Sequence, residues 1–119
     1  MKKLIIKIGL INDMKKELTD IFKDPEKGKR NTHTLYLKNS REFYEILSPQ
    51  RLELLRYITG NSFEKNTISE LAKKLKRKQE AVSRDAGILS NNNLLKKIKE
   101  NQKTYLKANY DSLQIKLTN

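Results

Sequence analysis

A run of basic and polar residues in the middle of the chain carries the side chains best suited to chemistry. The set comprises Lys76, Arg77, Lys78, Gln79, Ser83 and Arg84. Lysine and arginine pair with phosphates, while arginine, glutamine and serine also form hydrogen bonds with the edges of bases. This combination predicts a surface that contacts a nucleic acid.

A second group of basic residues follows closer to the C-terminus and comprises Lys96, Lys97, Lys99 and Lys103. The whole chain of 119 residues has a formal net charge of +12. Residues 48–119 account for +8 of it and residues 1–47 for +4. Because neutralising phosphates releases counterions, we expect binding to double-stranded DNA that weakens steeply with salt.

Groups that catalyse reactions or bind metals are scarce. The chain has no cysteine, and its single histidine, His33, lies in a Thr-His-Thr context typical of an ordinary strand. Four scattered glycines form no phosphate-binding loop. No apolar run reaches the roughly 18 residues of a membrane span. We therefore expect a cytoplasmic protein that is not an enzyme, with no cofactor, no metal site and no membrane partner.

The elements that must position the basic residues follow one another between Ser48 and Lys107. Ser48 and Pro49 start one helix, and a capping box from Thr67 to Glu70 starts the next. A turn over residues 76–79 leads to a third helix with Val82, Ala86 and Leu89 on its apolar face, and residues 95–107 then predict a β-hairpin. This is the order of a winged helix-turn-helix, whose third helix enters a major groove.

The remaining segments flank this unit. Residues 3–8 and 32–38 have the alternation of strands, residues 14–22 that of an amphipathic helix, and residues 24–31 the composition of a loop. A last strand over residues 112–117 is expected to turn Leu113, Ile115 and Leu117 inward. The fold class is thus α+β. A strand-helix-strand extension over 1–46, for dimerisation or partner binding, precedes a winged helix-turn-helix domain over 47–119.

Four sequence blocks in this order carry a family resemblance: LSPQRLELLRYI at 47–58, ISELA at 68–72, VSRD at 82–85 and NLL at 93–95. Together they resemble the winged helix-turn-helix transcriptional regulators of the MarR/ArsR-like group. The ending YDSLQI at 110–115 is similar to that of small regulators, some of them antitoxin-like. The resemblance implies a homodimer that binds DNA, with Lys78, Gln79, Ser83 and Arg84 at recognition positions and the hairpin as the wing.

Two residues depart from the pattern of this group. Asn93 stands where a glycine is usual before the wing, and asparagine tolerates the left-handed conformation that ends a helix. Gly87 lies inside the recognition helix, where glycine costs about 1 kcal/mol relative to alanine. Either another group packs closely against Gly87 or the helix is weak there.

These observations leave three hypotheses. The first is a sequence-specific, dimeric DNA-binding regulator that represses a promoter, its own included, with the N-terminal strands pairing across the dimer. The second is an antitoxin that neutralises a toxin protein through the N-terminal region or the loop at 24–31. The third is a nonspecific nucleic-acid-binding protein, favoured by charge alone. Tyr105 and Tyr110 are expected to pack against the protein rather than to stack on bases.

Overall fold

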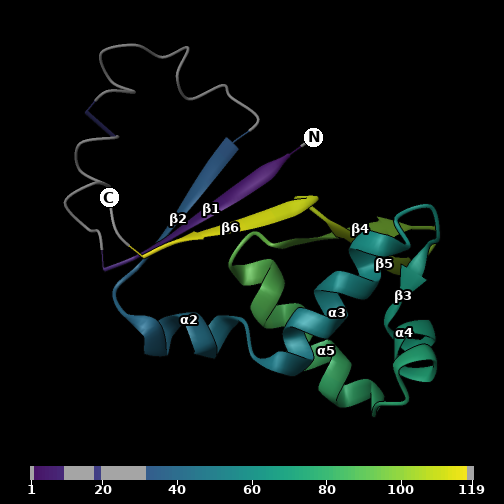
Figure 1. Ribbon diagram of the computed structural model, residues 1–119. Helices are drawn as coiled ribbons and strands as arrows, with labels where there is room; N and C mark the ends of the chain where they lie inside the picture. Colours follow the sequence, from purple (N-terminus) through teal and green to yellow (C-terminus); the bar gives the residue numbers. More distant parts are fainter. Residues whose placement is uncertain (1, 10–17, 20–31, 118–119) are drawn as a thin grey trace. The chain divides into compact units, whose positions relative to one another are not determined.

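The computed structural model describes residues 2–9, 18–19 and 32–117 (Figure 1). The chain is α+β and divides into two compact units. The first unit is formed by Met1–Glu45 together with Tyr110–Asn119, and the second by Ile46–Asn109. The winged helix-turn-helix therefore lies in the second unit.

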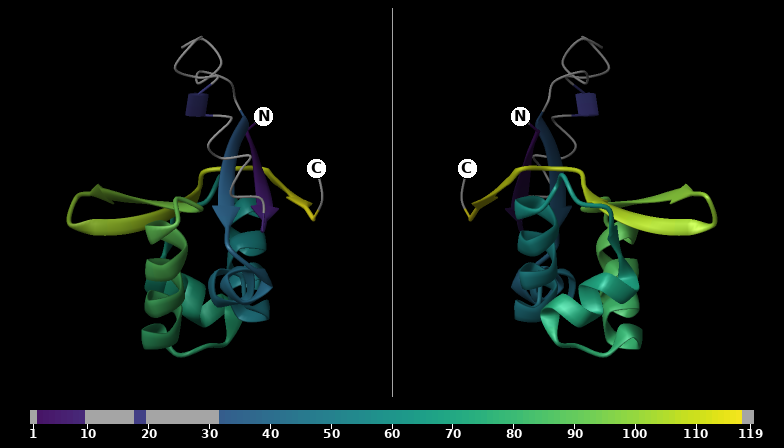
Figure 2. Two further views of the ribbon diagram at one scale, coloured as in Figure 1. Left: turned by 90° about the vertical axis from the view of Figure 1, so that its left-hand side faces the viewer. Right: turned by 90° about the vertical axis from the view of Figure 1, so that its right-hand side faces the viewer.

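The second unit consists of three helices and a three-stranded antiparallel sheet. Its elements are α3 (Pro49–Gly60), β3 (Asn66–Thr67), α4 (Ile68–Leu75), α5 (Gln79–Asn91), β4 (Leu95–Glu100) and β5 (Lys103–Ala108). The strand order is β3-β5-β4. Figure 2 shows the β4–β5 hairpin extending away from the three helices as a wing.

Side-chain caps start the first two helices as the sequence predicts. Ser48 Oγ accepts a hydrogen bond from the backbone N–H of Arg51 at 3.3 Å, and Pro49 occupies the first helical position. Thr67 Oγ1 accepts one from the backbone N–H of Glu70, also at 3.3 Å. Each cap satisfies one of the N–H groups that the first turn of a helix leaves without a partner.

The end of α5 depends on Asn93, which adopts the left-handed conformation with φ 62°. Its backbone N–H donates to the carbonyl of Ser90 at 3.1 Å, and that of Leu94 donates to the carbonyl of Leu89 at 2.9 Å. This pair of bonds is a Schellman motif, completed by the buried side chains of Leu89 and Leu94. The expectation that asparagine replaces glycine here is confirmed.

The core of the second unit lies where the three helices meet the base of the wing. Its buried apolar residues are Ile46, Leu47, Leu54, Leu55, Ile58, Leu71, Ala72, Val82, Ala86, Leu89, Leu94, Leu95 and Leu106. Each large side chain of this kind contributes about 1.5–3 kcal/mol when fully buried. The apolar stripe expected on the third helix is thus the face that α5 turns to the core.

The first unit contains a parallel sheet of β1 (Lys3–Ile8), β2 (Thr32–Leu37) and β6 (Ser112–Lys116), in the order β2-β1-β6 (Figure 1). The helix α2 (Ser40–Ile46) follows β2. Parallel neighbours need a crossover connection of a dozen or more residues, a length that residues 9–31 supply between β1 and β2. Apart from residues 18–19, the expected helix at 14–22 lies outside the described residues, as does the loop at 24–31 on which the antitoxin hypothesis draws.

Strand β6 differs from the sequence expectation in partner and in exposure. It pairs with β1, with Leu113 beside Leu4 and Ile115 beside Ile6, so this segment, expected in the winged domain, lies in the first unit. Ile115 is 46% exposed and Leu117 71% exposed, so these two do not point into a core. β6 is an edge strand of the described sheet, with a neighbour on one side only, whereas Leu4 and Ile6 in the central strand β1 are buried.

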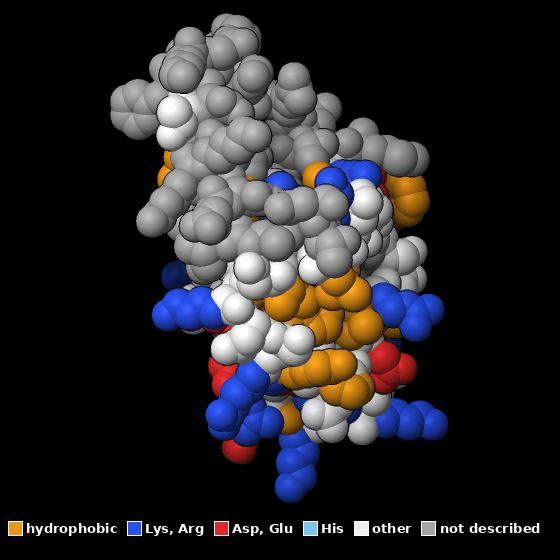
Figure 3. All heavy atoms as spheres, turned by 60° about the vertical axis from the view of Figure 1, so that its left-hand side comes forward, with side chains coloured by type: hydrophobic (Ala, Val, Ile, Leu, Met, Phe, Trp, Pro, Cys, Tyr) orange, Lys and Arg blue, Asp and Glu red, His pale blue; other side chains and the backbone are white. Residues whose placement is uncertain are grey.

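Exposed large hydrophobic side chains are found in both units. Among the described residues they are Leu18, Tyr44, Leu52, Phe63, Ile115 and Leu117. Figure 3 shows one face on which hydrophobic side chains gather, with lysine and arginine around them. Scattered apolar side chains are normal on a protein surface, but two of them on or beside the edge strand β6 make that edge apolar.

Gly87 provides a test of how α5 is stabilised. A Cβ placed there meets no atom within 4 Å, so close packing does not explain the glycine and the helix is weak at this point. We expect Gly87→Ala to raise the free energy of unfolding by about 1 kcal/mol in a urea titration. Asn93→Ala, just beyond the C-terminus of the same helix, should lower it by about 1–2 kcal/mol because φ is positive there. Changes of equal sign would contradict this account of the helix.

Candidate nucleic-acid interface

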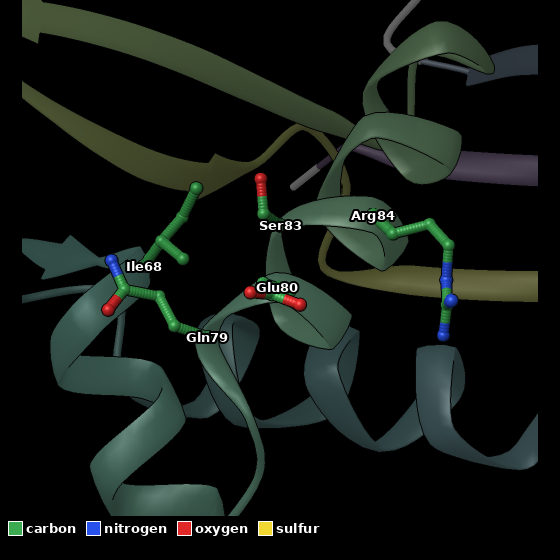
Figure 4. Close-up of a pocket in the computed structure, with 5 residues that line it drawn as sticks. All are labelled: Ile68, Gln79, Glu80, Ser83 and Arg84. Atoms are coloured by element: carbon green, nitrogen blue, oxygen red, sulfur yellow. The ribbon is translucent and has the colours of Figure 1, made fainter.

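The first half of α5 carries a shallow depression on the surface of the second unit. Ile68, Gln79, Glu80, Ser83 and Arg84 line it (Figure 4). Ile68 comes from the start of α4, and the other four come from the first two turns of α5. Gln79, expected in the preceding turn, is the first residue of this helix.

The side chains of the depression point in different directions (Figure 4). Ser83 and Ile68 rise on the same side, while Arg84 extends away from Ile68 and Gln79. Gln79, Ser83 and Arg84 are all exposed, as expected for recognition positions. Glu80 is exposed as well and belongs to the same surface, although the sequence reasoning did not single it out.

The three basic residues of the turn before α5 differ in their exposure to solvent. Lys76 ends α4 in the left-handed conformation with φ 54°, and the next backbone N–H, of Arg77, donates to the carbonyl of Ala72 at 2.9 Å. Lys76 and Lys78 are exposed, but Arg77 is not, since its side chain is only 19% exposed. Two of the three turn residues therefore contribute to the surface.

Arg77 pairs with a buried carboxylate, contrary to its expected place among the DNA-contacting residues. Its Nη2 donates to Oδ2 of Asp85 at 2.5 Å, and Nη1 of Arg51 donates to Oδ1 of the same carboxylate at 3.1 Å. The Asp85 side chain is 3% exposed and that of Arg51 15%. One carboxylate thus joins α5, the turn and α3, and Arg77 is committed to it.

Charged groups in such a place must be paired, because removing a charge from water is costly. Arg51 is held further by its Nε, which donates to the carbonyl of Ile46 at 2.9 Å. The sequence contains a signal for this arrangement: Asp85 falls in the stripe of Val82, Ala86 and Leu89, at spacings of three, one and four residues. An acidic residue at an apolar position of a helix indicates a buried partner.

The N-terminus of α5 adds a positive end to the surface. Lys78 is the N-cap residue, and its side chain makes no capping hydrogen bond. The first N–H groups of a helix, together with the helix dipole, attract anions such as phosphate. The exposed side chains of Lys76 and Lys78 lie next to this terminus in the sequence and reinforce its sign.

The wing carries its lysines on both faces of the hairpin. Residues directly opposite each other in an antiparallel pair share a face. Lys96 lies opposite Lys107 and Lys103 opposite Glu100, whereas Lys97 lies opposite Leu106 and Lys99 opposite Thr104. All five lysines are exposed. Lys107, which the sequence reasoning did not select, joins the four expected lysines through this register.

The tip of the wing is a two-residue turn at Asn101 and Gln102, with φ values of 51° and 66°. Positive φ at both positions matches the right-handed twist of the flanking strands. On the flank of the wing, Lys65 Nζ lies 5.3 Å from the ring centroid of Tyr105 and 3.5 Å from a carboxylate oxygen of Glu100, the residue before the tip. These contacts hold Tyr105 against the protein.

Tyr110 and Lys74 each contact another side chain of the protein. Tyr110 lies in the first unit with its ring centroid 5.7 Å from that of His33, and burial raises the pKa of its hydroxyl. Lys74 donates to Glu64 at 2.6 Å, and this hydrogen bond, with a weaker effect from Tyr57, raises the pKa of its ammonium group. Lys74 therefore remains charged, with its charge directed at Glu64.

In residues 2–9, 18–19 and 32–117, no three histidine, aspartate or glutamate side chains are grouped so that they could hold a metal ion. Over the same residues, the helices are too short or too polar to span a membrane.

Comparisons with known proteins place the chain in a family. The family model HVO_A0114 matches residues 46–115, which is more than half of the chain. The chain belongs to the HVO_A0114 family. The HVO_A0114 match begins where the second unit begins and includes α3, α4, α5 and the wing, and hence all the residues of the candidate interface.

Among solved structures, HlyU from Vibrio cholerae N16961 is similar at a lower level, with 22% sequence identity and a TM-score of 0.47. The similarity covers 56% of this chain and 70% of that chain. A search of proteins with curated descriptions gave no match.

The buried carboxylate yields a prediction about stability. Asp85→Ala leaves the inward-facing guanidinium groups of Arg51 and Arg77 without their partner, and we expect a loss of about 3–5 kcal/mol in the free energy of unfolding. Lys65→Ala removes an ion pair whose side chains are 65% and 50% exposed, and it should cost less than about 1 kcal/mol. Equal losses in chemical denaturation would show that Asp85 does not hold the helices together.

Proposed function

We propose that this protein is a sequence-specific DNA-binding transcriptional regulator that acts as a dimer and represses promoters, its own included. The observation that carries the proposal is the set of exposed polar side chains on the first two turns of α5, with exposed lysines in the turn before it and on the wing of the same unit. In a winged helix-turn-helix, these are the segments that meet DNA. The net charge of +12 agrees with a polyanionic partner.

The proposed contacts follow from the side-chain chemistry. The exposed part of α5 enters a major groove, which is wide enough for one helix, and presents Gln79, Ser83 and Arg84 to base edges. Lys76 and Lys78 meet phosphates beside the N-terminus of the helix. The wing contributes phosphate contacts through Lys96, Lys97, Lys99, Lys103 and Lys107. Arg77 is left out of this set because Asp85 holds its guanidinium.

The dimer is proposed to form through the outer edge of β6. An edge strand presents backbone N–H and C=O groups that can pair with another chain, and Ile115 and Leu117 are exposed at this edge. A two-fold axis at Ile115 sets it against its own copy and sets Leu113 against the partner's Leu117. The same register places Gln114 opposite Lys116 of the partner subunit, so no like charges oppose each other. Two-fold symmetry then requires two half-sites about one helical turn apart, or a multiple of that.

DNA binding is tested by fluorescence anisotropy with a duplex from upstream of the gene and a shuffled duplex, across a salt series. We expect the wild-type protein to prefer the native duplex at physiological salt. Arg84→Ala should weaken that preference by roughly 5- to 150-fold, because it removes a contact to a base. Lys103→Ala should weaken binding to both duplexes alike. It should also reduce the slope of log affinity against log salt concentration by about one, as expected for the loss of one phosphate contact.

The contrary outcome is equally clear. Equal affinity for the two duplexes, lost together as salt rises, would make the surface a general polyanion-binding one and would refute sequence-specific regulation. This is the result expected from the nonspecific nucleic-acid-binding hypothesis.

The dimer is tested with single cysteines, since the chain has none of its own. Ile115→Cys should form a disulfide-linked dimer under mild oxidation, because the two copies of residue 115 face each other at about 4.5–5.5 Å. Gln114→Cys is the matched control: its two copies are offset by two positions, more than about 7 Å apart, and should not link. Equal linking of both variants, or of neither, on a non-reducing gel would exclude this register.

A further inference from the structure

Glu80 is an acidic residue in the middle of the proposed reading surface. It is the second residue of α5, it is exposed, and it lines the same depression as Gln79, Ser83 and Arg84. Figure 4 shows it between Gln79 and Arg84. Any helix that places Gln79 and Arg84 in a groove therefore brings this carboxylate to the same bases.

The surroundings of Glu80 are cationic. Lys78 precedes it by two residues, Arg84 follows it by one helical turn, and the N-terminus of α5 contributes its positive end. In the described part of the chain, no salt bridge involves Glu80, in contrast to Glu64, Glu100 and Asp85. A carboxylate on a surface that meets phosphates is repelled by them, so it opposes nonspecific binding.

The major groove offers a carboxylate one type of partner. Cytosine presents the N4 amino group and adenine the N6 amino group, both hydrogen-bond donors. Guanine and thymine present O6, N7 and O4, which are acceptors and repel a carboxylate. At the position that Glu80 reaches, only cytosine or adenine therefore offers its carboxylate a donor in the major groove.

We propose that Glu80 is a specificity-determining residue, which accepts a hydrogen bond from the amino group of a cytosine or adenine and rejects guanine and thymine at that position. The inference rests on the proposed function and names one base contact within it. The carboxylate also acts by repulsion. It weakens binding to phosphates and to bases that present acceptors, so it increases the preference for one sequence more than the affinity for it.

A structural role for Glu80 makes different predictions. Acidic residues favour the first turn of a helix because of its dipole, and Glu70, the third residue of α4, is an acidic residue in such a turn as well. Glu70 is exposed too but does not line the depression. Glu70→Ala is therefore the matched control: it removes an acidic residue from the first turn of a helix without changing the reading surface.

The experiment selects duplexes from a randomised library with the wild-type protein, Glu80→Ala, Glu80→Gln and Glu70→Ala. We expect the wild type and Glu70→Ala to enrich cytosine or adenine at one position in each half-site, with guanine or thymine there weakening binding about tenfold. Glu80→Ala and Glu80→Gln should accept all four bases at that position within about twofold. Glu80→Ala should also bind random duplex more tightly than the wild type, because the repulsion is gone.

A base analogue separates recognition of the amino group from indirect effects. In the selected duplex, 2-pyrimidinone in place of cytosine, or purine in place of adenine, removes only the exocyclic amino group. The wild-type protein should lose about tenfold in affinity on this change, and Glu80→Ala should lose less than about twofold.

The outcomes distinguish this inference from the function on which it rests. If the wild type selects a sequence and Glu80→Ala selects the same one with the same preferences, the inference is overturned and Glu80 serves only the helix. The thermal unfolding midpoints of Glu80→Ala and Glu70→Ala would then fall by similar amounts. If the wild type enriches no sequence, the proposed function itself fails and the inference with it.

Discussion

The Asp85 carboxylate accepts hydrogen bonds from Arg51 on one oxygen and from Arg77 on the other. The three residues come from α5, α3 and the turn between α4 and α5, so one buried carboxylate fixes α5 against α3. The backbone contributes through Lys76, whose left-handed conformation reverses the chain so that Arg77 turns inward while Lys76 and Lys78 stay outside. The exposed polar set of α5 depends on this pairing, because turning the helix over would bring the buried side chains of Val82 and Ala86 to the surface.

Local sequence patterns predicted most of the second unit, because its caps and its turn require few residues close together. Ser48, Thr67 and Asn93 act within four residues of themselves, and their roles follow from their side chains alone. Pairs of side chains that come from different elements were harder to predict from the sequence. Arg77 looks like its neighbours in a run of basic residues, and only the position of Asp85, 8 residues away in sequence, shows which of the three turns inward.

The first unit marks the limit of prediction from periodicity. Alternation with a period of two indicated the strands at 3–8, 32–38 and 112–117, but it cannot name a strand's neighbour or its direction. β6 lies beside β1 with 103 residues between Ile8 and Ser112 along the chain, and no feature of either strand specifies parallel pairing. The same limit applies to Ile115 and Leu117: alternation separates the two faces of a strand, but it does not say whether another element covers the apolar face.

The wing shows how the proposed function conflicts with the stability of the isolated protein. Lys96 and Lys107 lie directly opposite each other, and like charges in that relation destabilise a hairpin. Packing alone does not require either charge, because both side chains are exposed. A phosphate placed between the two ammonium groups would convert their repulsion into two attractions, and the hairpin would then be more stable on DNA than off it. Under the proposed function, this repulsion in the free protein is the cost of a surface that binds a polyanion, and the role proposed for Glu80 on α5 is to limit nonspecific binding by that surface.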